Sequence, residues 1–181
     1  VVLVDLDLRR PVQHKLFNLD KKHGISEYIS EQKNELSDYI KKSKIKNLDI
    51  ITSGIIPPNP SELLASSNMT KAIAKLKESY DYVMIDSPPV IAVTDSMVLA
   101  KKVDILTLAV RVSQADKKVI QRTKELLENI DVKIDGAVIN GIRPHSYYSS
   151  YEYNYYYYYY YGDEEHKKTK PSILRKNKSI S

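Results

Sequence analysis

The chain has 181 residues, 42% of them hydrophobic, which allows one globular domain with a sizeable core plus a terminal extension. It has no cysteine, which excludes disulfides, thiolate nucleophiles and cysteine-based metal sites and fits a reducing compartment. The formal net charge is +5, and no apolar run approaches the length of a membrane span.

Five short apolar runs predict the strands of a mainly parallel sheet. Each run is apolar at consecutive positions, a pattern typical of strands that helices cover on both faces. The predicted strands are Val1–Val4, Leu48–Thr52, Tyr82–Ile85, Ile105–Val110 and Ala137–Asn140. Because the first run begins at residue 1 without an initiating Met, we expect the chain to be the C-terminal part of a longer protein.

Helical patterns lie between the predicted strands. Residues 11–43 have a mixed, helical character with a break at Gly24, and Asn59-Pro60-Ser61-Glu62 is typical of a helix start. Two apolar helix faces follow, made of Met69, Ala72, Ile73 and Leu76, and of Ile120, Thr123, Leu127 and Ile130. This alternation predicts an α/β, doubly wound domain over residues 1–143.

Residues 144–181 are predicted to form a flexible tail outside this domain. Eleven of the fifteen tyrosines lie in residues 147–161, in a run without helical or strand periodicity. The basic segment Gly162–Ser181 has the composition of a disordered, solvated tail, and we expect no nucleic-acid partner. Composition alone leaves two interpretations of the tyrosines open: phosphate acceptors, or a low-complexity segment prone to stacking and aggregation.

Acidic residues follow two of the predicted strands. Asp5 and Asp7 stand in VVLVDLDLRRP, and Asp86 stands in VMIDSPPV. Ligands of open α/β sheets bind beyond the carboxyl ends of the strands, so we expect the three acids to converge. Mg²⁺ would relieve their mutual repulsion, and Arg9 adds the positive charge that phosphate chemistry requires. One Asp after a strand is often only a turn or helix cap, whereas two such motifs favour a metal-dependent phosphate site.

These two motifs resemble the Walker A′ and Walker B motifs of bacterial tyrosine kinases, the BY-kinases. SGIIPPNPSELLAS resembles the segment between those motifs, and the tyrosine run resembles the family's C-terminal autophosphorylation tail. The resemblance covers essentially the whole chain in the right order. It implies a P-loop fold related to the MinD/ParA ATPases, protein-tyrosine kinase activity with ATP and Mg²⁺, and a role in capsule and exopolysaccharide export.

The resemblance also implies roles for the acidic motifs. Asp7 would be the general base or orienting acid for the incoming tyrosine, and Asp5 its partner around Mg²⁺. Asp86 would hold Mg²⁺, through water, and Arg9 would stabilise charge near the phosphates.

The remaining implied roles fall in the last third of the chain. Asn140 and Arg143 lie where related ATPases contact adenine. The acceptor hydroxyls would belong to Tyr147, Tyr148, Tyr151, Tyr153, Tyr155, Tyr156, Tyr157, Tyr158, Tyr159, Tyr160 and Tyr161. The implied partners are other copies of the chain, phosphorylated in trans, and a membrane activator at the cytoplasmic face of the plasma membrane.

A Walker A loop, G-x-x-x-x-G-K-[ST], is absent from the 181 residues. In the family this loop precedes Walker A′, so we expect residues 1–143 to be a kinase domain without its N-terminal Walker A part, and inactive alone. Two alternatives stay open: a MinD/ParA-like ATPase that phosphorylates nothing, and a non-catalytic scaffold at the membrane. The tyrosine run argues against the ATPase, in which it would have no purpose. The absent Walker A loop favours the scaffold only if Val1 is the true start of the protein.

Overall fold

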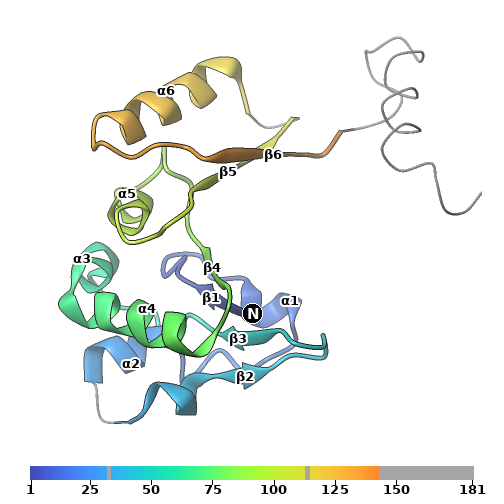
Figure 1. Ribbon diagram of the computed structural model, residues 1–181, viewed down its shortest axis with the longest axis vertical. Helices are drawn as coiled ribbons and strands as arrows, with labels where there is room; N and C mark the ends of the chain where they lie inside the picture. The colour runs from blue at the N-terminus through green and yellow to red at the C-terminus, as the bar shows by residue number, and fades with distance from the viewer. Residues whose placement is uncertain (32–33, 113–114, 143–181) are drawn as a thin grey trace, which may run out of the picture. The chain divides into compact units, whose positions relative to one another are not determined.

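Strands and helices alternate along the computed structural model, which describes residues 1–31, 34–112 and 115–142 (Figure 1). The predicted acceptor tyrosines, Arg143 and the predicted flexible tail therefore lie outside the described residues. Internal contacts define one unit as Val1–Gly141. The elements in chain order are β1 (Val2–Asp5), α1 (Gln13–Leu16), α2 (Ile25–Glu31), η1 (Leu36–Tyr39, a 3₁₀ turn), β2 (Lys41–Lys42), β3 (Asp49–Ile51), α3 (Pro60–Ala65), α4 (Ser67–Ser79), β4 (Val83–Asp86), α5 (Asp95–Ala100), β5 (Thr107–Arg111), α6 (Lys117–Glu128) and β6 (Gly136–Asn140).

Strand β1 forms the centre of a four-stranded sheet with the order β2-β3-β1-β4. It pairs in parallel with β3 on one side and with β4 on the other. Val2, Val4, Leu6 and Leu8 alternate along it and its continuation, and all four side chains are buried in the hydrophobic core. The apolar period of two therefore fixes the direction of the acidic residues that stand between them.

The edge strand β2 was not predicted from the sequence. It has only two residues, both lysines, and pairs antiparallel with β3. Lys42 Nζ lies 2.8 Å from Asp49 Oδ2, an ion pair between the two strands. Charged residues are typical of exposed edge strands, but a two-residue strand leaves no periodic signal in the sequence.

The predicted helix after Asn59 is divided into α3 and α4. Ser66 ends α3 and caps α4, since its Oγ accepts a hydrogen bond from the Met69 N–H at 3.2 Å. Asn59 precedes α3 but makes no cap bond to the backbone; its amide donates to Glu62 Oε2 instead. The predicted apolar face of α4 is confirmed, because Met69, Ala72, Ile73 and Leu76 are all buried.

Strands β5 and β6 form a separate two-stranded parallel sheet. We predicted strands buried on both faces, and this was wrong for β5 and β6, where Ile105, just before β5, and Ile139 are 72% and 60% exposed. It was also wrong for β4, where Met84 is 57% exposed. The physical reason is pairing, because no strand among the described residues bonds to the outer edge of β4 or joins it to β5. The predicted α/β class with a mainly parallel sheet is confirmed.

The second predicted helix face is confirmed in part. Thr123 and Leu127 are buried on α6, and Asp116 caps this helix by accepting from the Lys118 N–H. Ile130 lies beyond the last helical residue. None of the helices in the described part of the chain is long and apolar enough to span a bilayer.

Candidate functional site

Two of the predicted site acids meet where β1 and β4 end. Asp5 is the last residue of β1, Asp86 is the last residue of β4, and the two are direct partners in the parallel register. The backbone continues the pairing past the strand ends, since the Leu6 N–H donates to the Asp86 carbonyl at 2.8 Å. The sheet itself therefore brings these two carboxylates together.

Gln13 connects both acids and was missed by the sequence reasoning. Its backbone N–H donates to Asp5 Oδ2 at 3.1 Å, and its side-chain Nε2 donates to Asp86 Oδ2 at 2.7 Å. Gln13 opens α1, the short helix that follows Pro11. No pattern in the sequence could have singled it out, because its role depends on a contact with a residue 73 positions away.

Burial makes Asp5 an unusual carboxylate. Its side chain is fully buried, and burial, together with the nearby charges of Asp86 and Asp7, raises its pKa from 3.8 to about 6. The Gln13 N–H opposes this rise. Asp5 Oδ1 is buried and has no hydrogen-bond partner among the described residues. A buried, unpaired acceptor oxygen among like charges is an environment that a bound cation would stabilise.

The acids fit a cation that shares its ligands with substrate and water. Within residues 1–31, 34–112 and 115–142, no group of three or more His, Cys, Asp or Glu side chains is arranged to hold a metal ion. Mg²⁺ commonly binds one or two carboxylates and completes its shell with water and phosphate oxygens. Asp5 and Asp86 supply such a pair, while Asp7 contributes to the local negative charge.

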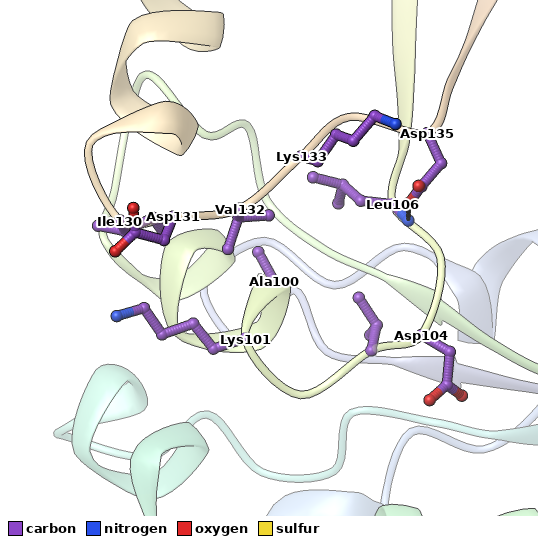
Figure 2. A pocket seen from close by; sticks show the side chains of 10 residues that line it. Ala100, Lys101, Asp104, Leu106, Ile130, Asp131, Val132, Lys133 and Asp135 are labelled. Carbon is purple, nitrogen blue, oxygen red and sulfur yellow. Dashed lines mark hydrogen bonds between the residues drawn. The ribbon is translucent and has the colours of Figure 1, made fainter.

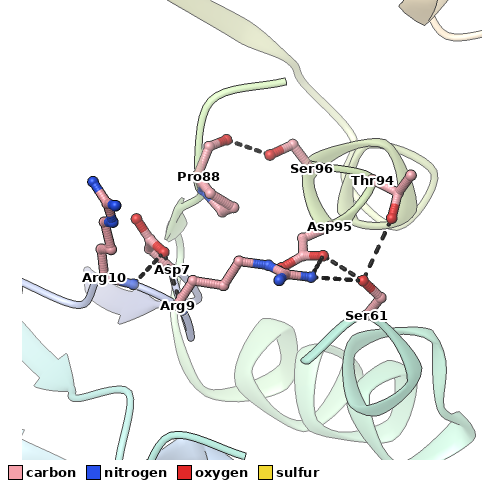
Figure 3. A network of polar contacts seen from close by, with 8 residues as sticks. All are labelled: Asp7, Arg9, Arg10, Ser61, Pro88, Thr94, Asp95 and Ser96. Carbon is pink, nitrogen blue, oxygen red and sulfur yellow. Dashed lines mark hydrogen bonds and ion pairs between the residues drawn. The ribbon is translucent and has the colours of Figure 1, made fainter. Parts of the chain in front are cut away.

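Asp7 is held by the main chain of the turn that follows it. Its Oδ1 accepts hydrogen bonds from the Arg9 N–H at 3.2 Å and from the Arg10 N–H at 2.9 Å (Figure 3). The side chain is half-buried, between the fully buried Leu6 and Leu8. The orientation of this carboxylate is thus set by two backbone donors.

The side chain of Arg9 is paired with an acid that the sequence reasoning did not single out. Arg9 Nε donates to Asp95 Oδ2 at 2.8 Å and Nη2 donates to Asp95 Oδ1 at 3.0 Å, a two-pronged contact (Figure 3). Ser61 Oγ also donates to Asp95 Oδ1, at 2.5 Å. Although burial opposes it, hydrogen bonds from Arg9 and Ser61 hold the pKa of Asp95 below its usual value. The hydrogen bond to Asp95 in turn raises the pKa of Arg9.

The predicted adenine-binding residue Asn140 lies in the other sheet. Asn140 ends β6 in the two-stranded sheet, is exposed, and accepts a hydrogen bond from the Gly141 N–H at 2.6 Å. Among the described residues, no hydrogen bond or ion pair links Asn140 to Asp5, Asp7 or Asp86. Its proposed contact with adenine stays a prediction.

A cavity of about 510 Å³ lies away from the predicted site, between the end of α5 and the segment from α6 to β6 (Figure 2). Two lysines and three aspartates line the cavity together with apolar side chains, so the net charge of its lining is not positive and does not favour binding of an anion such as a nucleotide phosphate. Asp104 is already paired with Lys77, and Asp135 accepts from the Leu106 N–H. None of the predicted site residues lines this cavity.

Comparisons with known proteins identify the fold and the family. A family model described as an AAA domain matches residues 1–135. The cell-division ATPase MinD of Pyrococcus furiosus shares the fold, with a TM-score of 0.59 at 19% identity, over 77% of this chain and 58% of that chain. The chain therefore has an α/β fold of the P-loop NTPase type.

Two similar proteins are more specific. CapB of Staphylococcus aureus, named as a candidate tyrosine-protein kinase, is 38% identical over 154 residues, covering 85% of this chain and 67% of its own length. The kinase domain of the Escherichia coli tyrosine kinase Etk superposes with a TM-score of 0.75 at 37% identity, over 82% of this chain and 58% of that domain. The chain belongs to the bacterial tyrosine-kinase family. It spans only 19% of the full length of Etk.

Proposed function

We propose that the intact protein is a protein-tyrosine autokinase that transfers the γ-phosphate of ATP to tyrosines in residues 147–161. The observation that carries this proposal is the meeting of Asp5 and Asp86 at adjoining strand ends, in a chain that also concentrates its tyrosines in one run. Membership of the bacterial tyrosine-kinase family supports it.

Asp7 acts on the acceptor tyrosine. A phenol has a pKa near 10 and attacks phosphorus poorly until a base takes its proton. Two backbone N–H groups hold Oδ1 of Asp7, and its second oxygen accepts the phenolic proton. The tyrosine oxygen bonds to the γ-phosphorus while the bond to the β-phosphate oxygen breaks, and ADP leaves.

The other residues bind and orient the nucleotide. Mg²⁺, when bound, neutralises charge on the phosphate oxygens. Asp5 and Asp86 would hold the ion, since a buried unpaired oxygen and a neighbouring carboxylate meet there. Arg9 stabilises phosphate charge with the edge of its guanidinium that does not contact Asp95, and Asn140 and Arg143 contact adenine.

We infer that the 181 residues alone transfer no phosphate. They contain no G-x-x-x-x-G-K-[ST] loop, which in P-loop enzymes supplies the backbone cradle and the lysine for the β- and γ-phosphates. Within the described part of the chain no strand pairs with the outer edge of β4, and Met84 on that strand is exposed, which supports a further strand at this edge in the intact protein. ATP binding should therefore be weak for residues 1–181 and strong for the intact protein.

Phosphorylation occurs between copies of the chain at the cytoplasmic face of the plasma membrane, with a membrane activator. Each phosphate adds about −1.5 to −2 charges, so the nearly neutral tyrosine run becomes strongly acidic and self-repelling. This change would separate the copies of a homo-oligomer. It is the proposed switch by which the kinase regulates capsular or exopolysaccharide synthesis and export.

The test is mass spectrometry of the intact protein after incubation with ATP and Mg²⁺. Phosphate on residues 147–161 is the expected result, and it should be absent from Asp7→Asn. ATP hydrolysis without phosphate on those residues would instead support a MinD/ParA-like ATPase. Neither hydrolysis nor transfer in the presence of the activator would support a scaffold.

Transfer between copies has its own experiment. The Asp7→Asn chain keeps its tyrosines but lacks the base, and a second chain with Phe in place of the tyrosines in 147–161 keeps the base. Mixing the two should place phosphate on the Asp7→Asn chain. If the Asp7→Asn chain carries no phosphate after mixing, transfer happens within one copy.

A further inference from the structure

We propose that Asp95, together with Ser61, is a positioning residue that orients the predicted base Asp7 through Arg9. The inference rests on the phosphotransfer proposed above for its catalytic readout. It adds two residues from α5 and α3 to the machinery at the end of β1.

The first step is the anchoring of Arg9. The Asp95 side chain is 0% exposed, and each of its oxygens accepts from the Arg9 guanidinium. Ser61 Oγ donates to Asp95 Oδ1 and also accepts from Arg9 Nη2 at 3.2 Å, so three side chains share one closed set of hydrogen bonds (Figure 3). A bidentate contact with a buried carboxylate fixes the guanidinium in both position and plane.

The second step is the main chain of the same residue. The N–H groups of Arg9 and Arg10 both donate to Asp7 Oδ1, at 3.2 and 2.9 Å. Residue 9 therefore contacts the acid Asp95 with its side chain and the acid Asp7 with its backbone. Fixing the side chain of Arg9 restrains the turn whose N–H groups orient Asp7.

The third step is how Asp95 and Ser61, which anchor Arg9, are themselves held in place. Asp95 opens α5 and Ser61 lies in α3, and these two helices contact each other. Ser96, the next residue, donates from Oγ to the Pro88 carbonyl in the loop after β4. The anchor of Arg9 is thus itself tied to the loop that follows Asp86. A displacement of about 1 Å at a reacting group can cost about a hundredfold in rate, so such restraint has a catalytic consequence.

The experiment compares Asp95→Asn with Asp104→Asn in the intact, isotope-labelled protein. Asp104→Asn is the matched control, because it breaks an exposed aspartate–lysine pair of similar length, 2.7 Å to Lys77. Asp95→Asn should lower kcat by about tenfold or more with KM for ATP within about twofold of the parent. It should also speed amide hydrogen exchange at residues 9 and 10 by about tenfold, while the control changes neither quantity.

Each outcome decides the inference. A fall in kcat with unchanged exchange at residues 9 and 10 would overturn it, and so would equal effects of the two variants. If the parent protein transfers no phosphate, the proposed function fails, and the exchange measurement still decides the positioning role. If Asp95→Asn does not fold, Ser61→Ala is measured in its place and should shift both readouts in the same direction; no shift would overturn the inference.

Discussion

Replacing Asp5 by Asn should stabilise the Mg²⁺-free protein against unfolding at neutral pH. Asp5 is fully buried, and burial raises its pKa from 3.8 to about 6. That difference corresponds to about 3 kcal/mol of unfavourable free energy for keeping the buried carboxylate charged above pH 6. Asn has nearly the same shape and carries no charge, and its carbonyl oxygen can still accept from the Gln13 N–H. The expected gain is therefore up to about 3 kcal/mol.

The sign of the pH dependence follows from the raised pKa. Between pH 3.8 and about 6, Asp5 is mostly protonated in the folded state and mostly ionised in the unfolded state. The stabilisation from a protonated Asp5 is complete below pH 3.8 and is lost as pH rises through about 6. The advantage of Asp5→Asn should thus be largest above pH 6 and should vanish at low pH.

Urea unfolding with a metal chelator, at pH 7.5 and at about pH 4, measures this difference. Asp104→Asn serves as the control. Because the Asp104 side chain is exposed, this substitution should change the free energy of unfolding by less than about 0.5 kcal/mol. At pH 7.5, saturating Mg²⁺ should then stabilise the parent but not Asp5→Asn, since the ion offsets the charge of the buried, ionised carboxylate. An Asp5→Asn variant that is less stable than the parent at pH 7.5 without Mg²⁺ would refute the reasoning.

Three further substitutions separate function from folding. Asp7→Asn should abolish tyrosine phosphorylation while the midpoint of urea unfolding stays close to that of the parent. The reason is that this half-buried side chain contributes to chemistry more than to packing. Normal phosphorylation of the variant would exclude Asp7 as the base. Leu76→Ala, in the buried face of α4, should cost about 2–5 kcal/mol in urea unfolding. Leu16→Ala, at a side chain that is 72% exposed, should cost less than about 0.5 kcal/mol, and equal losses would contradict the assigned core.

Local patterns in the sequence were enough to predict β1, β4 and the acids that follow them. Each of these strands is a short apolar run, Val1–Val4 or Tyr82–Ile85, and its acid follows within a few residues, so a local pattern was sufficient. The convergence of Asp5 and Asp86 followed from a general rule about parallel sheets. The buried face of α4 likewise followed from its helical period.

Contacts between distant parts of the chain were beyond the reach of such patterns. Asp95 in VTDSMVLA has the appearance of an ordinary helix start, and nothing nearby indicates that Arg9, 86 positions away, is its partner. Gln13 is equally inconspicuous until the strands are paired. The exposure of β5 and β6 was mispredicted for a related reason, because an apolar run shows that a strand can be covered but not what covers it.

The register that makes Asp5 and Asp86 direct partners also limits how this site can evolve and be regulated. Neighbouring strands lie about 4.8 Å apart, a spacing set by backbone hydrogen bonds and not by the side chains. Lengthening one carboxylate by a methylene, as in Asp86→Glu, therefore cannot be absorbed by moving the strands apart. Control of such a rigid pair of acids has to come from the groups that approach it, by admitting or withholding nucleotide and tyrosine. Regulation through those groups would leave the central strand β1 undisturbed.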